Sequence, residues 1–371
     1  MTNAIDLIDK LSINSNTLTK KKEQTDYKIK YVSEYIKQWA IINSERDSVK
    51  ELSFIDCMCN AGIYTDGDLC TSIEVLRIFE EIAEKHPEKI YNLYLNDYDA
   101  KKIETIKKVA KYFHAKKNNI RIIINNDDVN VYLKKLYNNS KIFGYNKSVV
   151  LYVDPYDFGT VHISNVHRIL EKYYCELIFN FFISDYVRNW KTDKDRISTC
   201  LDGVTVETKE DLIKYLESQF KVGFIKYKFS YQFKTQTNVE LYQIMFFTPN
   251  KKGLEVLKDT LWSVFNGEFF HRNKRKNENE QFSLFTKEYN KEWLLELHAK
   301  DARNLLCANG ESIMTYSQIE ILLIEKSMLK ESQIINNVIK PLINQGVITK
   351  MNTVSSKTNY KGDSYKIGVV K

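Results

Sequence analysis

The residues of this 371-residue chain whose types and spacing most clearly indicate chemistry are Asp154, Pro155 and Tyr156. They stand at the end of an apolar run that begins at Val149 and predicts a strand. A carboxylate oxygen and a neighbouring backbone carbonyl at such a strand end accept hydrogen bonds from an amino group, while the aromatic ring stacks on the substrate. These hydrogen bonds direct the nitrogen lone pair at a methyl donor, so the chemistry is positioning more than acid–base catalysis. The alternative is an Asp-Pro turn with a tyrosine that only packs.

An earlier loop has the residue types that a methyl donor needs around it. Asp56 ends the predicted strand Leu52–Asp56, and Ala61 and Gly62 follow it closely. Small residues let the backbone approach a bound cofactor. We therefore expect Asp56, Ala61 and Gly62 to shape the pocket for the methionine and ribose parts of S-adenosylmethionine (SAM). A plain turn from strand to helix is the alternative.

The next two predicted strands are also followed by acidic residues. Asp97 comes directly after Tyr91–Asn96. Its separation from the first loop along the sequence is that of a carboxylate that accepts hydrogen bonds from both ribose hydroxyls. The alternative role is to cap the next helix, and Asp99 is the better placed of the two for an N-cap. Asp127 and Asp128 follow the third strand, where an acid meets the adenine amino group in SAM sites. One of these two caps a helix in the alternative reading, and the sequence does not decide between them.

The fifth predicted strand, Glu176–Phe182, brings polar groups to the same edge of the sheet. It contains Asn180, and Arg188 follows it. We expect Asn180 and Arg188 to bind the substrate, with Arg188 suited to an anionic group. A solvated helix arginine is the equal alternative for Arg188.

The elements that must position these residues alternate between apolar strands and amphipathic helices. The predicted strands are Leu52–Asp56, Tyr91–Asn96, Ile120–Asn125, Val149–Asp154, Glu176–Phe182, Phe224–Tyr231 and Glu240–Phe247, and the helices among the first five are Ser72–Lys85, Ala100–Phe113, Val129–Tyr137 and Ile163–Tyr174. This alternation predicts an α/β fold with a parallel sheet covered on both faces. Such sheets bind ligands beyond the carboxyl ends of their strands, which is where the acidic residues stand.

The chain divides into four predicted segments: an N-terminal arm (1–24), a Rossmann-like domain (25–265), a basic linker (266–288) and a helical, winged-helix-like domain (289–371). The last segment has the order helix, helix, strand, loop, strand, which is typical of a winged helix. Lys357 and Lys361 lie in the polar hairpin that would be its wing. We expect both lysines to contact a nucleic acid.

Composition limits the function classes. The net charge of +7 and the pI of about 8.8 permit a nucleic-acid partner without requiring one. No apolar run approaches the ~20 residues of a membrane-spanning helix, and no signal peptide is visible, so we expect a cytoplasmic protein without a membrane partner. The six cysteines form no CxxC pair and are expected to be thiols. Cys57, Cys59 and Cys70 lack a fourth ligand at a usual spacing, so no metal site is predicted.

With these residues in view, the sequence resembles the three-Cys-motif partner protein family from about residue 25 onward. The similarity is carried by Thr25, Lys28, Tyr35, Trp39, Phe54-Ile55-Asp56, Ala61-Gly62, Tyr64, Asp66-Gly67, Ser72, Asp154-Pro155-Tyr156, Asn180-Phe181, Arg188, Tyr242–Phe247 and Gly253. Two departures are Cys59-Asn60, where the family has an aromatic residue, and Cys70–Ile73, which replaces a Gly-Ser-Pro step. The resemblance implies a SAM-dependent methyltransferase-like fold. The name of the family refers to three cysteines in a partner protein, which the resemblance implies for this chain as well.

Together these features predict a Rossmann-like class I methyltransferase sheet with a C-terminal winged-helix-like domain. The predicted function is SAM-dependent methylation of an amino group in a nucleic acid or a nucleic-acid-associated substrate. DNA or RNA would be recruited by the winged helix and the basic linker through phosphate contacts. Protein docking or dimerisation is the equal alternative for the winged helix. For the whole chain, the alternative is a catalytically idle methyltransferase-fold protein that binds a protein partner. A nuclease is disfavoured, because the sequence shows no cluster of acidic residues and lysine with the spacing of a metal-dependent nuclease.

Overall fold

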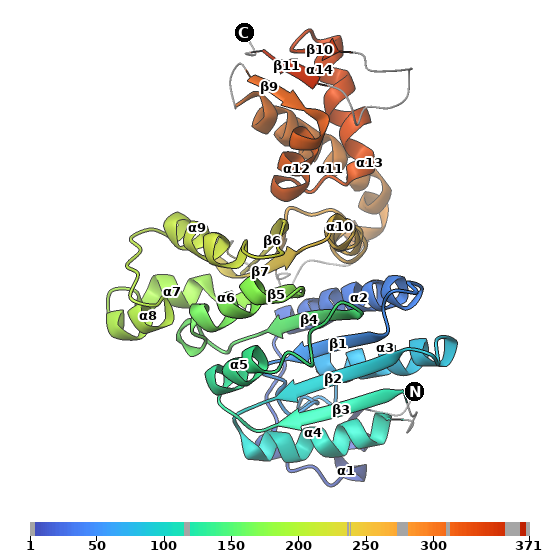
Figure 1. The fold of residues 1–371 in the computed structure, drawn as a ribbon, viewed down its shortest axis with the longest axis vertical. Coiled ribbons are helices and arrows are strands. Elements are labelled where there is room, and N and C mark those ends of the chain that lie inside the picture. Colours follow the sequence, from blue (N-terminus) through green and yellow to red (C-terminus); the bar gives the residue numbers. More distant parts are fainter. Residues whose placement is uncertain are drawn as a thin grey trace. The chain divides into compact units, whose positions relative to one another are not determined.

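The computed structural model describes residues 4–114, 119–235, 237, 239–272, 281–308, 312–352 and 364–368, which Figure 1 traces along the chain. The chain forms two compact units. The first consists of Met1–Gly253 with Phe270–Asn273, and the second of Leu254–Phe269 with Lys274–Lys371. Within the described part of the chain, no helix is both long enough and apolar enough to cross a membrane.

The first unit is built on a mostly parallel sheet whose described strands number eight, in the order β3-β2-β1-β4-β5-β7-β6-β8. They are β1 (Glu51–Asp56), β2 (Ile90–Asn96), β3 (Ile120–Asn125), β4 (Lys147–Val153), β5 (Glu176–Phe181), β6 (Tyr227–Lys234), β7 (Glu240–Thr248) and β8 (Phe270–Arg272). Strands β1 to β5 are parallel, β7 is antiparallel to both β5 and β6, and β8 is parallel to β6. The unit is therefore a mixed α/β fold with a large central sheet.

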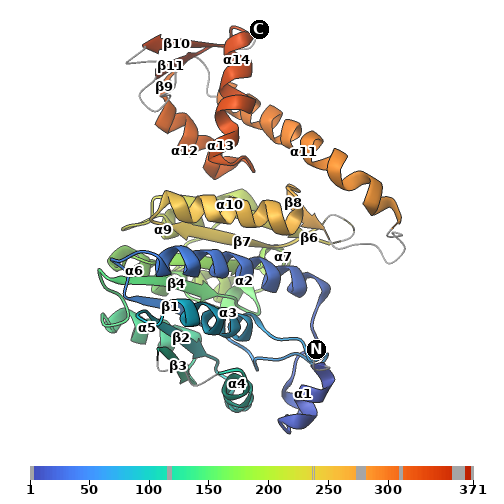
Figure 2. The same cartoon turned by 90° about the vertical axis from the view of Figure 1, so that its right-hand side faces the viewer.

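Helices cover both faces of this sheet. They are α1 (Ala4–Lys10), α2 (Glu23–Ser44), α3 (Thr71–Lys85), α4 (Ala100–Phe113), α5 (Val129–Asn138), α6 (Ile163–Lys172), α7 (Ile183–Asn189), α8 (Lys194–Cys200) and α9 (Lys209–Phe220), with the 3-10 turns η1 (Ser15–Thr17) and η2 (Phe158–Thr160). On one face, Leu133 of α5 and Val166 of α6 are buried in one core with Leu151 and Phe179 of the sheet. On the other face α2 and α3 lie side by side (Figure 2), and Tyr35 of α2 packs on the sheet.

Most of the predicted strands and helices of the first unit are present. The strand Ile120–Asn125 and the helix Ala100–Phe113 have the predicted bounds, and the other strands and helices of the predicted set differ by a few residues at their ends. Each of these elements has an apolar run or an apolar helix face that is bounded by polar residues. This periodic pattern is the strongest local signal for secondary structure. Residues 183–220, for which the sequence indicated no element, form α7, α8 and α9.

Two connecting segments differ from expectation. The segment 1–24, expected as an arm, contains α1 and η1 and buries Leu7, Ile13 and Leu18. The segment 266–288, expected as a basic linker, contains β8 and the beginning of α11 (Gln281–Cys307). Strand β8 forms because the edge of β6 offers backbone hydrogen bonds to an arriving segment, and this tertiary pairing overrides a polar sequence pattern.

The second unit combines helices with a small antiparallel sheet. It contains most of α10 (Lys251–Phe265), α11, α12 (Tyr316–Lys326), α13 (Glu331–Ile334), the π-helical turn η3 (Ile335–Ile339) and α14 (Lys340–Asn344), with β9 (Ser312–Thr315), β10 (Ile348–Asn352) and β11 (Ser364–Ile367). The sheet order is β10-β11-β9, so the last strand lies between the other two. Ile319, Ile334 and Tyr365 are fully buried in this unit. Lys357 and Lys361 lie outside the described residues.

Candidate cofactor and acceptor site

The site lies where the direction of strand addition reverses. The chain adds β2 and β3 on one side of β1 and then β4 and β5 on the other side, so the switch point lies between β1 and β4. In the register, Asp56 of β1 stands beside Leu95 of β2 and Tyr152 of β4. The carboxyl ends of these strands therefore bring Asp56, Asp97 and Asp154 to one edge of the sheet, where doubly wound folds bind their ligands.

Asp56 is buried and is used by the loop that follows it. Its carboxylate accepts hydrogen bonds from the backbone N–H of Met58 (3.1 Å) and from the hydroxyl of Ser72 in the first turn of α3. Burial raises the pKa of Asp56 to about 7, against the lowering effect of these two hydrogen bonds and with a small contribution from nearby Asp154 and Asp97. Asp56 therefore ties the loop to α3, and its charge changes near neutral pH.

Ala61 and Gly62 are buried in the same loop. Gly62 has a φ of +84°, a left-handed conformation that glycine adopts without strain. A Cβ atom built on Gly62 would lie 2.9 Å from Cγ1 of Ile106 and 3.3 Å from Cγ1 of Ile73. The missing side chain at position 62 therefore makes room for α3 and α4, whereas the sequence pattern suggested that it makes room for a ligand.

Asp97 is buried directly after β2 and connects two loops. One of its oxygens accepts a hydrogen bond from the backbone N–H of Asn60 (3.0 Å), and the other accepts one from the backbone N–H of Asp99 (3.0 Å). The N-cap of α4 is Asp99, whose side chain accepts from the backbone N–H of Lys101 (2.9 Å). Asp97 is thus not the helix cap, and its carboxylate is held in place by backbone donors at the switch point.

The structure separates Asp127 from Asp128. Asp128 is the N-cap of α5 and accepts from the backbone N–H of Asn130 (2.9 Å), so its carboxylate has a local role. Asp127 pairs with Lys135 at 2.7 Å. The side chain of Asn96, which the sequence did not indicate, donates to the backbone carbonyl of Asp127 (3.0 Å) and accepts from its N–H (3.1 Å). The sequence feature that could have indicated these two hydrogen bonds is an asparagine at the last position of β2.

Asp154 is surrounded by three donors, all of them side chains. Lys28 of α2 reaches one oxygen (2.6 Å), which also accepts from the Tyr152 hydroxyl (3.0 Å), and the amide nitrogen of Asn180 donates to the other oxygen (2.6 Å). The side chains of Lys28 and Asp154 are only 12% and 20% exposed, so the ion pair is largely shielded from water. The ammonium group of Lys28 also lies 5.9 Å from the ring centre of Tyr242. Lys28 belongs to this cluster although only its place in the family resemblance marked it in the sequence.

Tyr156 extends from Pro155 toward α4. Lys102 of α4 donates a hydrogen bond to the Tyr156 hydroxyl (2.6 Å), and its ammonium group lies 4.5 Å from the ring centre. Burial raises the pKa of Tyr156, and the negative charges of Asp97 and Asp154 add to this effect. The contacts with Lys102 therefore hold the aromatic ring against α4.

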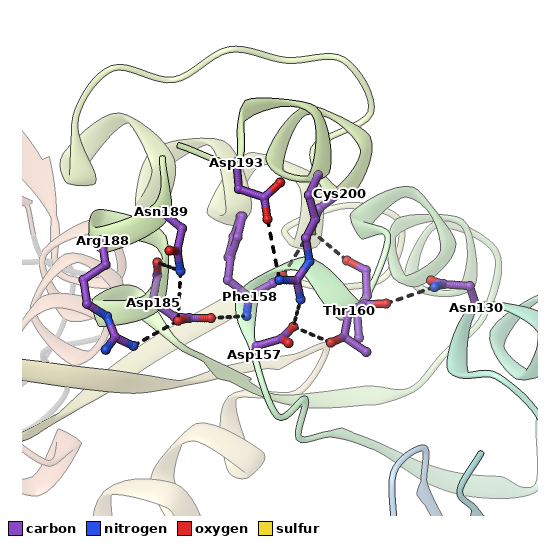
Figure 3. A network of polar contacts seen from close by, with 11 residues as sticks. Asn130, Asp157, Phe158, Thr160, Asp185, Arg188, Asn189, Asp193 and Cys200 are labelled. Atoms are coloured by element: carbon purple, nitrogen blue, oxygen red, sulfur yellow. Dashed lines mark hydrogen bonds and ion pairs between the residues drawn. The ribbon is translucent and has the colours of Figure 1, made fainter. Parts of the chain in front are cut away.

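The loop after Tyr156 is attached to α7 and α8, as Figure 3 shows. Asp157 pairs with Arg196 of α8, and the backbone N–H of Phe158 donates to Asp185 of α7 (3.3 Å). Arg188, expected to bind substrate, pairs with Asp185 at 3.0 Å, and its side chain is 73% exposed. Arg188 is thus placed on the outer side of this network, apart from the Asp154 cluster.

Three buried cysteines lie in the loop after β1 and at the start of α3. Cys57, Cys59 and Cys70 are all buried, and burial raises the pKa of each thiol, which keeps it protonated. The thiol of Cys70 donates to the carbonyl oxygen of Cys59 (3.6 Å), and that of Cys59 to the carbonyl oxygen of Asn60 (3.6 Å). These contacts give the cysteines a packing role inside the loop.

Two buried carbonyl oxygens in this region have no hydrogen-bond partner among the described residues. They are Oδ1 of Asn60, in the loop after β1, and Oδ1 of Asn180, in β5. The orientation of the Asn180 amide follows from its neighbour, because an ionised Asp154 can only accept. Buried acceptors are normally paired, so two orphaned oxygens at one sheet edge fit a ligand that carries N–H and O–H donors. SAM carries such donors on its ammonium, ribose and adenine groups.

No model of a known protein family matches the chain, and no curated protein matches it. Among solved structures, it is similar to a mutant of the 16S rRNA (adenine(1408)-N(1))-methyltransferase from Catenulisporales acidiphilia, at 8% identity and a TM-score of 0.28, over 57% of this chain and 90% of that chain. It is also similar to a DUF574 family protein from Streptomyces avermitilis, at 10% identity and a TM-score of 0.31, over 59% of this chain and 83% of that chain. At this level of agreement, reaction and substrate must be judged from the chain's own residues.

Proposed function

We propose that this chain is a SAM-dependent methyltransferase. The observation that carries the proposal is the row of acidic and amide side chains at the carboxyl ends of β1, β2, β4 and β5, on both sides of the switch point. The strand order, with β7 antiparallel beside β5, agrees with the class I methyltransferase sheet that the sequence predicts. The orphaned oxygens of Asn60 and Asn180 add acceptors for the donors of a cofactor and a substrate.

On the cofactor side, Asp97 is proposed to hold the ribose, and the loop from Asp56 to Gly62 to enclose the methionine part. Asp127 is preferred to Asp128 for the adenine amino group, because the carboxylate of Asp128 already caps α5. When bound, SAM supplies an electrophilic methyl group on its sulfonium. The residues of the chain contribute binding and orientation.

On the acceptor side, Asp154, Pro155, Tyr156 and Asn180 are proposed to receive an amino group. An ionised carboxylate has about four lone-pair directions, and Asp154 has three donors. The remaining direction and the free oxygen of Asn180 would accept the two N–H groups of the substrate, while the Tyr156 ring stacks on it. Arg188, which is exposed and paired with Asp185 apart from this cluster, is proposed to meet an anionic group of a large substrate from outside.

The second unit is proposed to recruit a nucleic acid as a winged-helix-like domain. Its order of helix, strand, helices and two further strands, with the last strand central in the small sheet, supports this. Basic residues of such a domain would contact phosphates, which position a substrate without reading its sequence. If this is right, the affinity of the full chain for duplex DNA or RNA falls steeply with added salt. A flat salt dependence would instead favour docking of a protein, such as the three-cysteine partner that the family resemblance implies.

A catalytically idle binding protein is the second candidate, and one observation favours it. The carboxylate of Asp154 is already engaged by Lys28, Tyr152 and Asn180, which leaves only one lone-pair direction for an acceptor. Such a protein would keep the fold and bind a partner without transferring a methyl group.

Calorimetry with SAM and S-adenosylhomocysteine (SAH) tests the proposal directly. We expect both ligands to bind the full chain, and no heat at high micromolar ligand would contradict the methyltransferase function. Asp154→Ala should retain cofactor binding and lose methyl transfer to nucleic-acid acceptors from radiolabelled SAM. Loss of cofactor binding in that variant would mean that Asp154 belongs to the cofactor side of the site.

A further inference from the structure

The segment that precedes α2 is attached to the loop after β1. The carbonyl oxygen of Thr19 accepts a hydrogen bond from the backbone N–H of Thr65 (3.2 Å), and its hydroxyl accepts one from the side-chain nitrogen of Asn60 (3.0 Å). Lys21 forms an ion pair with Asp68 near the far end of the same loop. The N-terminal segment therefore forms one wall of the loop proposed to hold the cofactor.

Asn60 is the residue through which this wall reaches the carboxylate of Asp97. Its φ is +59°, a left-handed conformation that asparagine tolerates better than most residues. Its backbone N–H donates to Asp97 (3.0 Å), the carboxylate proposed for the ribose, so its side chain starts beside that group. The side-chain nitrogen is held by Thr19, while Oδ1 is buried and has no partner among the described residues.

We infer that Oδ1 of Asn60 accepts a hydrogen bond from SAM, and that Thr19 is the positioning residue that orients the amide for this contact. The inference rests on the proposed function, because it takes Asp97 as the ribose carboxylate. A carbonyl oxygen can only accept, so its partner must be an N–H or O–H group. Because Asn60 bonds to the proposed ribose carboxylate, while the adenine is assigned to Asp127, the two sources on the cofactor are a ribose hydroxyl and the ammonium group of the methionine part.

Binding of SAH to variants of Asn60 tests the contact. Asn60→Gly removes the side chain and tolerates the same backbone angle, so we expect SAH affinity to fall about tenfold, as for one lost hydrogen bond of typical strength. Because the variant also removes a buried oxygen without a partner, its thermal midpoint without ligand should stay within about 2 °C of the wild type. A purely structural role would lower both quantities. Asn60→Asp keeps an acceptor at this position and should bind SAH more tightly than Asn60→Gly.

Variants of the N-terminal segment test the positioning role. Thr19→Val removes the hydroxyl and should weaken SAH binding several-fold, whereas Thr19→Ser keeps the hydroxyl and should restore wild-type affinity. Thr17→Val is the matched control, because Thr17 lies in the same segment but contacts Asn14 and Thr105 instead of the loop. Its SAH affinity should remain unchanged.

The outcomes separate the inference from the function on which it rests. If wild-type protein does not bind SAH, the proposed function fails. If it binds SAH and Asn60→Gly binds it equally well, or if Asn60→Asp binds more weakly than Asn60→Gly, the inference is wrong. Adenosine, which lacks the methionine part, distinguishes the two sources: a loss for both ligands assigns the ribose hydroxyl, and a loss for SAH alone assigns the ammonium.

Discussion

Asp97 and Asp154, which lie on the two sides of the candidate site, receive their hydrogen bonds from different kinds of donor. On the cofactor side, Asp97 receives both of its hydrogen bonds from backbone N–H groups. On the acceptor side, Asp154 receives its hydrogen bonds from three side chains, which are Lys28, Tyr152 and Asn180. Backbone donors cannot leave unless the loop itself changes conformation, whereas a side chain can rotate to another rotamer. The carboxylate of Asp97 is therefore preorganised, whereas the donors of Asp154 can be exchanged for other groups.

Replacement of Asp97 should have the largest effect, because its carboxylate accepts hydrogen bonds from the backbone N–H groups of two separate loops. We expect Asp97→Ala to abolish SAH binding and to lower the free energy of unfolding by about 3 kcal/mol, since two buried N–H groups lose a charged partner. Calorimetry and urea unfolding measure the two quantities. Asp99→Ala is the control: loss of the α4 cap should cost about 1 kcal/mol and leave SAH affinity unchanged. Equal losses of affinity in both variants would contradict a preorganised Asp97 carboxylate.

Removal of Lys28 should destabilise the acceptor side and spare the cofactor. Lys28→Met leaves a largely buried Asp154 without its cation, which we expect to cost about 2–3 kcal/mol in urea unfolding, with SAH affinity nearly unchanged. Lys37→Met on the same helix is the control, because Lys37 forms only a distant, exposed pair with Glu81 and should cost less than about 0.5 kcal/mol. The double variant Lys28→Met with Asp154→Asn should recover part of the loss. Without such recovery, the ion pair would not be the source of the effect.

Stability should also depend on pH through Asp56. The pKa of Asp56 is raised to about 7 in the folded chain, against about 4 in the unfolded chain, so the folded state binds more protons between these values. The contribution of Asp56 to the free energy of unfolding is fully present below pH ~4 and is lost as pH rises through about 7. Over this range the free energy of unfolding should fall by about 1 kcal/mol per pH unit. Urea unfolding between pH 5 and 8 measures this slope.

Asp56→Asn keeps one acceptor oxygen for the Met58 N–H and offers an amide N–H that the Ser72 hydroxyl can accept, but it does not titrate, so it should flatten the pH profile. Glu176 has a pKa that burial also raises to about 7, and it accepts from Tyr35 and Thr248. Glu176→Gln should remove a second, similar part of the slope. If neither substitution changes the profile, other groups control the pH dependence.

The smallest effect is expected for the network that attaches the loop after Tyr156. Arg196 is 43% exposed, so Arg196→Met should cost less than about 1 kcal/mol and leave SAH affinity unchanged. A Cβ atom on Gly159 would lie 2.3 Å from Nε of Arg196, so Gly159→Ala should displace the same side chain. The two substitutions together should therefore cost little more than either alone, as urea unfolding would show. Full additivity would mean that Gly159 has another role.

Much of the fold could be predicted because its signals are local. The apolar runs that became β1 to β5 and the amphipathic helices between them follow from periodicity within short windows. The caps could be reasoned out in the same way: Asp99 was the better N-cap candidate, and the structure uses it for α4. The choice between Asp127 and Asp128 stayed open, because both carboxylates precede the helix and only three-dimensional contacts distinguish them.

The donors around the acidic residues could not be predicted, because they arrive from distant parts of the chain. Lys28 lies 126 residues before Asp154, and nothing in its neighbourhood indicates a carboxylate partner. The pairing of β8 with β6 likewise depends on an edge that exists only after the sheet has formed. The packing at Gly62 could not be predicted for the same reason, since the atoms that exclude a side chain there belong to Ile106 and Ile73.

By itself, the sequence determined the parallel sheet and the order of acidic residues at its strand ends, since apolar periodicity and strand-end position are properties of short segments. The tertiary structure alone decided how each of these carboxylates is used, because hydrogen bonds and ion pairs depend on which distant groups come within a few ångströms. It assigned Asp97 to two backbone donors, Asp56 to one backbone donor and one side chain, and Asp154 to side chains. Local patterns therefore place the acidic residues, and long-range packing sets their chemistry.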